Sequence, residues 1–169
     1  MKNFYLTIAL LLFFAVQGQE ATTTIYLIRH AEKVDDSADH ELSEAGNLRA
    51  NKWADYFKEK QISIFYTTAN KRSVYTIMTA TVIALDRTPG TTYNTEINTY
   101  DPKNFFLKDI AEKHKGEKII VVGHGNTIPA TINNYLGKNI YKDIPENEYG
   151  NLYIITIKGD NITHELVKI

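Results

Sequence analysis

The sequence predicts an α/β fold, a three-layer αβα sandwich with a mostly parallel sheet and an antiparallel C-terminal edge. Segments rich in β-branched and aromatic residues alternate with amphipathic segments, an order that favours parallel strands joined by crossover helices. The last two strand-like segments are separated only by a short turn sequence, which favours a hairpin. The chain has 169 residues, 43% of them hydrophobic and 23% charged, the proportions of one ordinary domain.

The first half of the predicted domain alternates strand, helix, strand and helix. Residues 23–28 are aliphatic, aromatic or β-branched almost without interruption, which is typical of a strand buried on both faces. A helix is expected to begin after the N-cap Ser43 and to run to Lys60, with apolar side chains at helical spacing. Residues 62–66 form a second strand and residues 72–85 a second helix, which the turn sequence at 87–90 ends.

The second half continues the alternation and ends in the hairpin. Pro102 favours a helix start just before Lys103, and Gly137 favours a helix end. The turn sequence between the last two strands is residues 158–161. The expected helices are residues 103–114 and 127–136. The expected strands are residues 92–97, 118–122, 152–157 and 162–167.

A secretory signal peptide is expected over residues 1–18. Lys2 precedes an apolar run from Phe4 to Val16, and Gly18 lies at the start of a polar stretch. As a helix, the apolar run would span about 20 Å against a hydrocarbon core of about 30 Å, so an uncleaved anchor is the less favoured alternative. Cleavage after Gly18 leaves residues 19–169 as one domain, exported to the periplasm or secreted, with no membrane attachment thereafter.

Charge and cysteine content exclude several classes of protein. The chain has 19 basic and 20 acidic side chains, a net charge of −1 and no long run of either sign, so no nucleic-acid partner is expected. The absence of cysteine excludes a disulfide framework, thiolate metal sites, a cysteine nucleophile and a lipoprotein anchor. The oligomeric state is left open.

Two histidines follow the two strands expected to be buried on both faces. The first strand runs into Arg29-His30-Ala31, and the strand at 118–122 runs into Gly123-His124-Gly125-Asn126. Because ligands of open α/β sheets lie off the carboxyl ends of the strands, both histidines are expected in one site. The neighbouring arginine and the helix N-termini just beyond suit an anion, and the expected guest is a phosphoryl group.

A metal site is the alternative reading of the same residues. His30, His124 and nearby carboxylates could supply ligands. The adjacent Arg29 would repel a cation, however, so neither a metal nor another cofactor is expected.

These residues resemble the histidine phosphatase (phosphoglycerate mutase-like) superfamily, whose markers occur here in order over residues 23–136. Arg29-His30-Ala31 matches the family's Arg-His-Gly with alanine as the third residue. Residues 42–50, LSEAGNLRA, match its Leu-Thr-x-x-Gly-x-x-Gln-Ala. The sequence from Tyr66 to Ser73, with Thr76 one turn later, matches a strand followed by a helix that opens with an arginine, and Gly123-His124 is the last marker.

The resemblance implies a role for each site residue and a phosphorylated small molecule or phosphoprotein as the partner. His30 would attack phosphorus and become phosphohistidine. Arg29 and Arg72 would bind the phosphate oxygens, and His124 would donate a hydrogen bond to them, with Asn126 in a supporting polar role.

The proton donor has three candidates. Many members of the family supply a carboxyl group from the region between the second helix and the late buried strand, where this chain has Glu96 and Asp101. Glu32 is the third candidate, two residues after the nucleophile. Asp101 is favoured because Pro102 would hold its carboxylate at a helix-start loop.

Three functions agree with these residues. The first is an exported phosphate monoester hydrolase that uses a phosphohistidine intermediate, with its substrate open. The second is a phosphohistidine or phosphoprotein phosphatase, since the short chain has little sequence for a specificity lid. The third is a catalytically silent phosphate-binding module, which the intact set of arginines and histidines disfavours.

Overall fold

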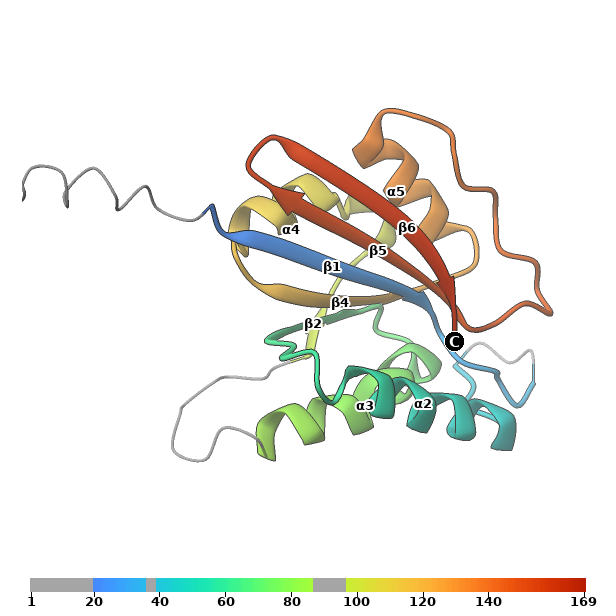
Figure 1. The fold of residues 1–169 in the computed structure, drawn as a ribbon. Helices are drawn as coiled ribbons and strands as arrows, with labels where there is room; N and C mark the ends of the chain where they lie inside the picture. Colours follow the sequence, from blue (N-terminus) through green and yellow to red (C-terminus); the bar gives the residue numbers. More distant parts are fainter. Residues whose placement is uncertain (1–19, 36–38, 87–96) are drawn as a thin grey trace, which may run out of the picture.

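The computed structural model describes residues 20–35, 39–86 and 97–169. Its centre is a six-stranded sheet in the order β3-β2-β4-β1-β5-β6 (Figure 1). Four of these strands run parallel to one another: β1 (Thr22–Arg29), β2 (Ile64–Thr67), β3 (Ile97–Thr99) and β4 (Lys118–Gly123). The hairpin of β5 (Asn151–Lys158) and β6 (Asn161–Lys168) adds the antiparallel edge. The predicted fold class is confirmed.

Helices cover both faces of the sheet. α2 (Glu44–Phe57) and α3 (Lys71–Asp86) lie on one face, and α4 (Leu107–Lys113) and α5 (Thr127–Leu136) on the other (Figure 1). The side chains of β1 alternate between two apolar cores, because successive residues of a strand point to opposite faces. Leu27 packs in the core beside α5, and Ile28 in the core beside α2. Both side chains are fully buried, so β1 lies in the middle layer of three, beside β4 at the centre of the sheet.

The helix ends follow the local signals in the sequence. Ser43 is the N-cap of α2, and its side chain accepts a hydrogen bond from the backbone N–H of Gly46 at 3.1 Å. α5 has the predicted bounds and ends at Gly137, whose φ of 63° is left-handed.

The single helix predicted over residues 103–114 is wrong. Pro102–Asn104 form a short 3-10 helix, Phe105 is extended, and α4 begins only at Leu107. The Phe105 ring is buried, with its centroid 4.0 Å from that of Tyr100. Burial of this ring against the core outweighs the local preference for a continuous helix.

One predicted strand is shifted in the structure, and two other predictions fall outside the described residues. β3 lies at residues 97–99, later than the predicted strand at 92–97, most of which is outside the described residues. The turn at 87–90 and the signal peptide at 1–18 are also outside them. Within the described ranges, no helix has both the length and the apolar character needed to cross a bilayer.

Candidate active site

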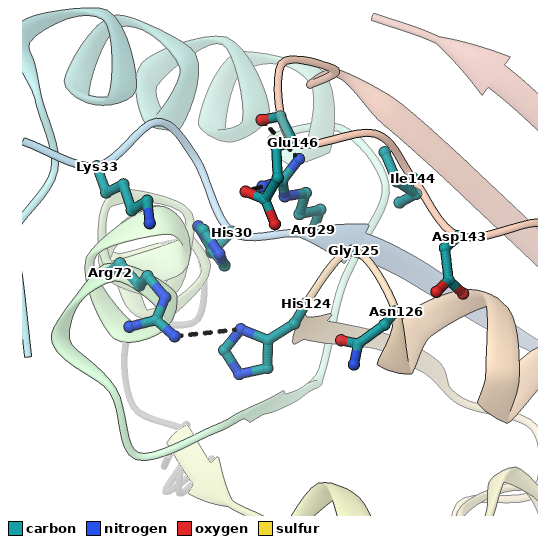
Figure 2. Close-up of a pocket in the computed structure, with 10 residues that line it drawn as sticks. All are labelled: Arg29, His30, Lys33, Arg72, His124, Gly125, Asn126, Asp143, Ile144 and Glu146. Atoms are coloured by element: carbon teal, nitrogen blue, oxygen red, sulfur yellow. Dashed lines mark hydrogen bonds and ion pairs between the residues drawn. The ribbon is translucent and has the colours of Figure 1, made fainter. Parts of the chain in front are cut away.

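A pocket of about 400 Å³ lies where the parallel strands β1 and β4 end (Figure 2). The register pairs Arg29 with Gly123, so the residues that follow the two strands meet at one edge of the sheet. The pocket brings together five residues named from the sequence: Arg29, His30, Arg72, His124 and Asn126. Its other lining residues are Lys33, Gly125, Asp143, Ile144 and Glu146.

Backbone bonds fix His30 at the floor of the pocket. Its N–H donates to the carbonyl of Gly123 at 2.9 Å, which continues the pairing of β1 with β4 for one more residue. The next N–H, that of Ala31, donates to the Thr76 hydroxyl of α3 at 2.8 Å. These bonds hold the His30 ring 5.3 Å from the His124 ring, measured between centroids.

The hydrogen bond of the His30 ring determines its tautomer. Nδ1 lies 2.8 Å from the carbonyl oxygen of Ala31, which can only accept, so Nδ1 carries the proton and Nε2 has the free lone pair. Burial lowers the pKa of His30 to about 3, with further lowering by Arg72, His124 and Arg29 against the opposing effect of the Ala31 bond. His30 is therefore neutral at pH 7 and can act as a nucleophile.

Arg72 lies in the first turn of α3, beside His124. Its Nη2 lies 3.5 Å from His124 Nδ1, and since a guanidinium can only donate, the neutral His124 ring carries its proton on Nε2. Burial, then Arg72 and Arg29, lower the pKa of His124 to about 4. Two guanidinium groups and two neutral imidazoles thus share one pocket.

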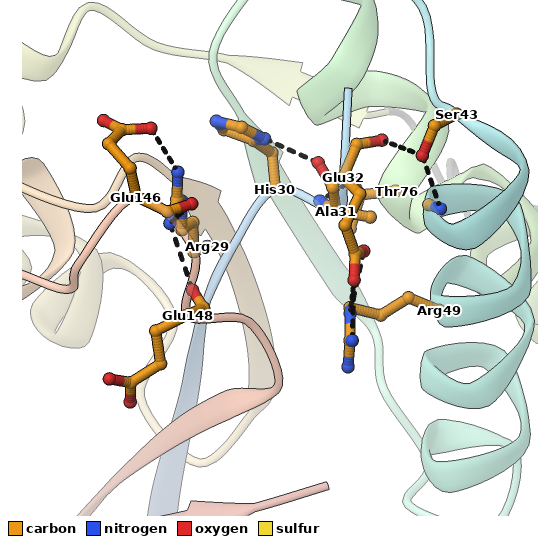
Figure 3. A network of polar contacts seen from close by, with 10 residues as sticks. Arg29, His30, Ala31, Glu32, Ser43, Arg49, Thr76, Glu146 and Glu148 are labelled. Carbon is orange, nitrogen blue, oxygen red and sulfur yellow. Dashed lines mark hydrogen bonds and ion pairs between the residues drawn. The ribbon is translucent and has the colours of Figure 1, made fainter. Parts of the chain in front are cut away.

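Arg29 is 5% exposed and holds the segment before β5 (Figure 3). Its Nη1 donates to the carbonyl oxygens of Pro145, Glu146 and Glu148 at 2.8–3.1 Å, and its Nη2 to the Glu146 carboxylate at 3.0 Å. Two donors of the pocket, Arg29 Nε and Arg72 Nη1, are buried without a hydrogen-bond partner among the described residues. Because buried donors are normally paired, these two N–H groups are available to an acceptor bound in the pocket, such as an anion.

The chain is similar in fold to several solved structures. The chain resembles phosphoglycerate mutase from Bacillus anthracis, with 13% identity over 88% of this chain and 94% of that one and a TM-score of 0.63. It resembles the protein histidine phosphatase SixA bound to tungstate, with 13% identity over 86% and 96% and a TM-score of 0.61. For an Entamoeba histolytica phosphoserine phosphatase variant bound to phosphoserine, the identity is 20% over 84% and 94%, with a TM-score of 0.58.

The chain shares its fold with these three structures. No family model and no curated protein matches it. The likeness to these three structures extends over nearly the whole length of each.

Neither described candidate for the proton donor lies in the pocket. Asp101 is exposed and caps the 3-10 helix, accepting hydrogen bonds from Lys103 N and Asn104 Nδ2 at 3.0 Å each. Glu32 binds the guanidinium of Arg49 through both oxygens at 2.7–2.9 Å (Figure 3). Burial alone would raise the pKa of Glu32, but the bonds from Arg49 hold it below the ordinary value. Glu96 lies outside the described residues.

Sequence reasoning missed the segment between α5 and β5, which supplies Asp143, Ile144 and Glu146 to the pocket. It also missed Tyr149, whose ring centroid lies 4.4 Å from the Arg29 guanidinium carbon. The sequence held one signal for this segment. Two carboxylates and a tyrosine lie in a stretch without helix or strand signals, just after the helix that follows His124.

The described residues contain no group of three or more His, Asp or Glu side chains that could hold a metal ion. The two histidines of the pocket face guanidinium groups instead. The donor set of the described pocket therefore suits an anion.

The free energy of unfolding is expected to fall as the pH falls from 7 towards 4. The pKa of His30 is 6.5 when unfolded and about 3 when folded, so within that window the unfolded chain binds more protons. The loss is at most about 1.4 kcal/mol per pH unit for each such histidine. Urea unfolding at pH 7 and pH 5 measures it, and His30→Ala should show a smaller difference between the two pH values. An equal difference in both proteins would contradict the lowered pKa.

Proposed function

We propose that the protein is a phosphate monoester hydrolase that works through a phosphohistidine at His30. The observation that carries the proposal is the pair of buried, unpartnered donors, Arg29 Nε and Arg72 Nη1, beside a neutral imidazole with a free lone pair. A tetrahedral dianion supplies the acceptors that these donors lack. The same pocket then offers the anion a nucleophile, which a site built only for binding does not need.

The reaction has two steps at this site. His30 Nε2 attacks phosphorus while Arg29 and Arg72 neutralise the charge on the equatorial oxygens. The Nε2–H of His124 donates to the same group, and Asn126 lies beside it at the start of α5. Water then hydrolyses the phosphohistidine and releases orthophosphate. His30 needs no deprotonation before it attacks, because burial keeps its pKa at about 3.

A phosphohistidine or phosphoprotein phosphatase is the second candidate. It is favoured by the likeness to SixA, a protein histidine phosphatase of which this chain covers 96%. Such a substrate needs an open site, and the described part of the chain places no additional domain over the pocket. Export, which we propose from the pattern of residues 1–18, favours an extracytoplasmic small-molecule ester instead.

Release of orthophosphate from a panel of substrates tests the proposal. The panel contains phosphorylated metabolites, a phosphohistidine peptide, a phosphoserine peptide and p-nitrophenyl phosphate, assayed over a pH series. Turnover of any member supports a phosphatase, and the preferred member gives the substrate class. Tight binding of tungstate without turnover of any member would leave a phosphate-binding module as the function.

Hydrolysis is expected to continue unchanged in excess EDTA. The charge of the transferring group is neutralised by Arg29, Arg72 and His124, so no step requires a divalent cation. The measurement is the rate of p-nitrophenol release with and without the chelator. Full loss of activity that Mg²⁺ or Zn²⁺ restores would revive the metal site considered from the sequence.

A further inference from the structure

Two carboxyl side chains line the described pocket, and they differ in their partners. The Glu146 carboxylate accepts a hydrogen bond from Arg29 Nη2 at 3.0 Å, although 90% of its side chain is exposed. Asp143 forms no hydrogen bond or ion pair with any residue in the described ranges. Asp143 is therefore the carboxyl group of this pocket that is not engaged by a cation.

The backbone around Asp143 is fastened to the residues proposed to bind phosphate. The N–H of Ile144 donates to the carbonyl of Gly125 at 2.9 Å, directly beside His124. On its other side the same segment is held by Arg29 Nη1, through the carbonyls of Pro145 and Glu146. These bonds fix the position of the Asp143 backbone, and its side chain is exposed to solvent.

The position of Asp143 suits a residue that contacts the leaving group of the substrate. Asp143 and Asn126 lie on the side of the pocket opposite Arg72 (Figure 2). The phosphoryl group is expected among Arg29, Arg72 and the two imidazoles, so the ester oxygen must point away from His30, towards the mouth. Asp143 lines the pocket and is exposed to solvent, whereas Asp101 and Glu32 are engaged outside the pocket.

We propose that Asp143 is the proton donor to the leaving oxygen, an inference that rests on the proposed phosphatase function. In the first step, the bond from His30 Nε2 to phosphorus forms and the bond from phosphorus to the ester oxygen breaks. The ester oxygen keeps the electron pair and takes the proton of the Asp143 carboxyl group, so an alcohol leaves.

The same carboxylate serves as the base in the second step. Water attacks phosphorus and gives one proton to Asp143, the phosphorus–nitrogen bond breaks, and its electron pair returns to His30 Nε2. Orthophosphate leaves, and Asp143 is protonated for the next cycle. The two steps balance without any further reactant.

The dependence on the leaving group tests the assignment. The full-length protein and its Asp143→Asn variant are assayed with β-glycerophosphate, whose alkoxide needs a proton, and with p-nitrophenyl phosphate, whose phenolate does not. We expect Asp143→Asn to lower kcat/KM for β-glycerophosphate by at least about 100-fold and to change that for p-nitrophenyl phosphate far less. With the aryl ester, a burst of nitrophenol should precede a slower steady state, because the variant lacks the base for the second step.

Two matched Asp→Asn variants accompany this assay. Asp160→Asn changes an exposed residue of the turn between β5 and β6 and should leave both rates unchanged. Asp101→Asn tests the donor favoured from the sequence. The proposal is overturned if Asp101→Asn rather than Asp143→Asn shows the loss that depends on the leaving group. It is also overturned if Asp143→Asn lowers kcat/KM equally for both esters or for neither of them.

The wild-type protein separates the failure of this inference from the failure of the proposed function. Wild-type turnover of the aryl ester without the alkyl ester would mean that no proton donor works, which overturns the role of Asp143 and leaves the phosphatase standing. If the wild-type protein turns over neither ester and no member of the wider panel, the proposed function itself is wrong.

Discussion

Replacing His30 with alanine is expected to abolish turnover of every phosphate monoester, with a loss in kcat of at least about 10⁴-fold. The variant keeps the guanidinium groups proposed to bind phosphate but removes Nε2, the atom proposed to form the bond to phosphorus. Substrate binding should therefore persist while chemistry stops. Steady-state kinetics on p-nitrophenyl phosphate, together with tungstate binding by calorimetry, measures the two effects separately.

Trapping the intermediate provides the direct control for His30. Wild-type protein quenched after mixing with ³²P-labelled substrate should carry a label that is labile in acid and stable in base, and His30→Ala should carry none. Because His30 is 4% exposed and packs beside the His124 ring, circular dichroism must show that the variant is folded. A folded His30→Ala protein that turns over normally would leave the likeness to phosphatases as one of fold alone.

Arg72→Ala is expected to behave differently from His30→Ala. It removes Nη1 and Nη2 from the pocket but leaves Arg29 and His30 in place, so residual activity should be measurable, with kcat and phosphate affinity both reduced. Activity as low as that of His30→Ala would indicate that Arg72 also holds His124 in its reactive position.

Those parts of the fold that depend on local signals could be predicted from the sequence. β1 and β4 are short apolar runs buried on both faces, and α5 begins and ends where its residues suggest. The meeting of His30 and His124 followed from the rule that parallel strands present their carboxyl ends at one edge. These inferences need no knowledge of distant contacts.

The missed or misplaced features depend on contacts between residues far apart in the chain. Arg29 is 116 residues from Pro145, so nothing near Arg29 in the sequence indicates that it would hold the segment carrying Asp143. The sequence offers Glu32 as a proton donor, but in the structure its carboxylate is paired with Arg49, 17 residues away. The helix expected at 103–114 is interrupted because Phe105 finds a place in the core.

Gly46→Ala is expected to destabilise the fold by about 2 kcal/mol or more, although alanine is the better helix former. Gly46 lies in the first turn of α2 against the backbone of Glu32, and a Cβ there would overlap the Glu32 carbonyl oxygen and lie 3.0 Å from the carbonyl carbon. Helix propensity alone would favour alanine by about 1 kcal/mol. A backbone atom cannot rotate out of the way as a side chain can, so we expect the overlap to prevail.

Gly137→Ala is the matched control. It makes the same substitution at a position with an unfavourable φ but no steric overlap, whereas Gly46 has steric overlap and a helical backbone. Gly137 has a φ of 63° and open space around its missing Cβ, so alanine there should cost only about 1 kcal/mol of backbone strain. Urea unfolding of both variants measures the difference, and a Gly46→Ala protein as stable as wild type would show that the contact with Glu32 is not tight.

Since the Glu32 carbonyl also accepts the N–H of Ser43 at 2.9 Å and lies two residues after His30, moving it should lower phosphatase activity in Gly46→Ala and not in Gly137→Ala.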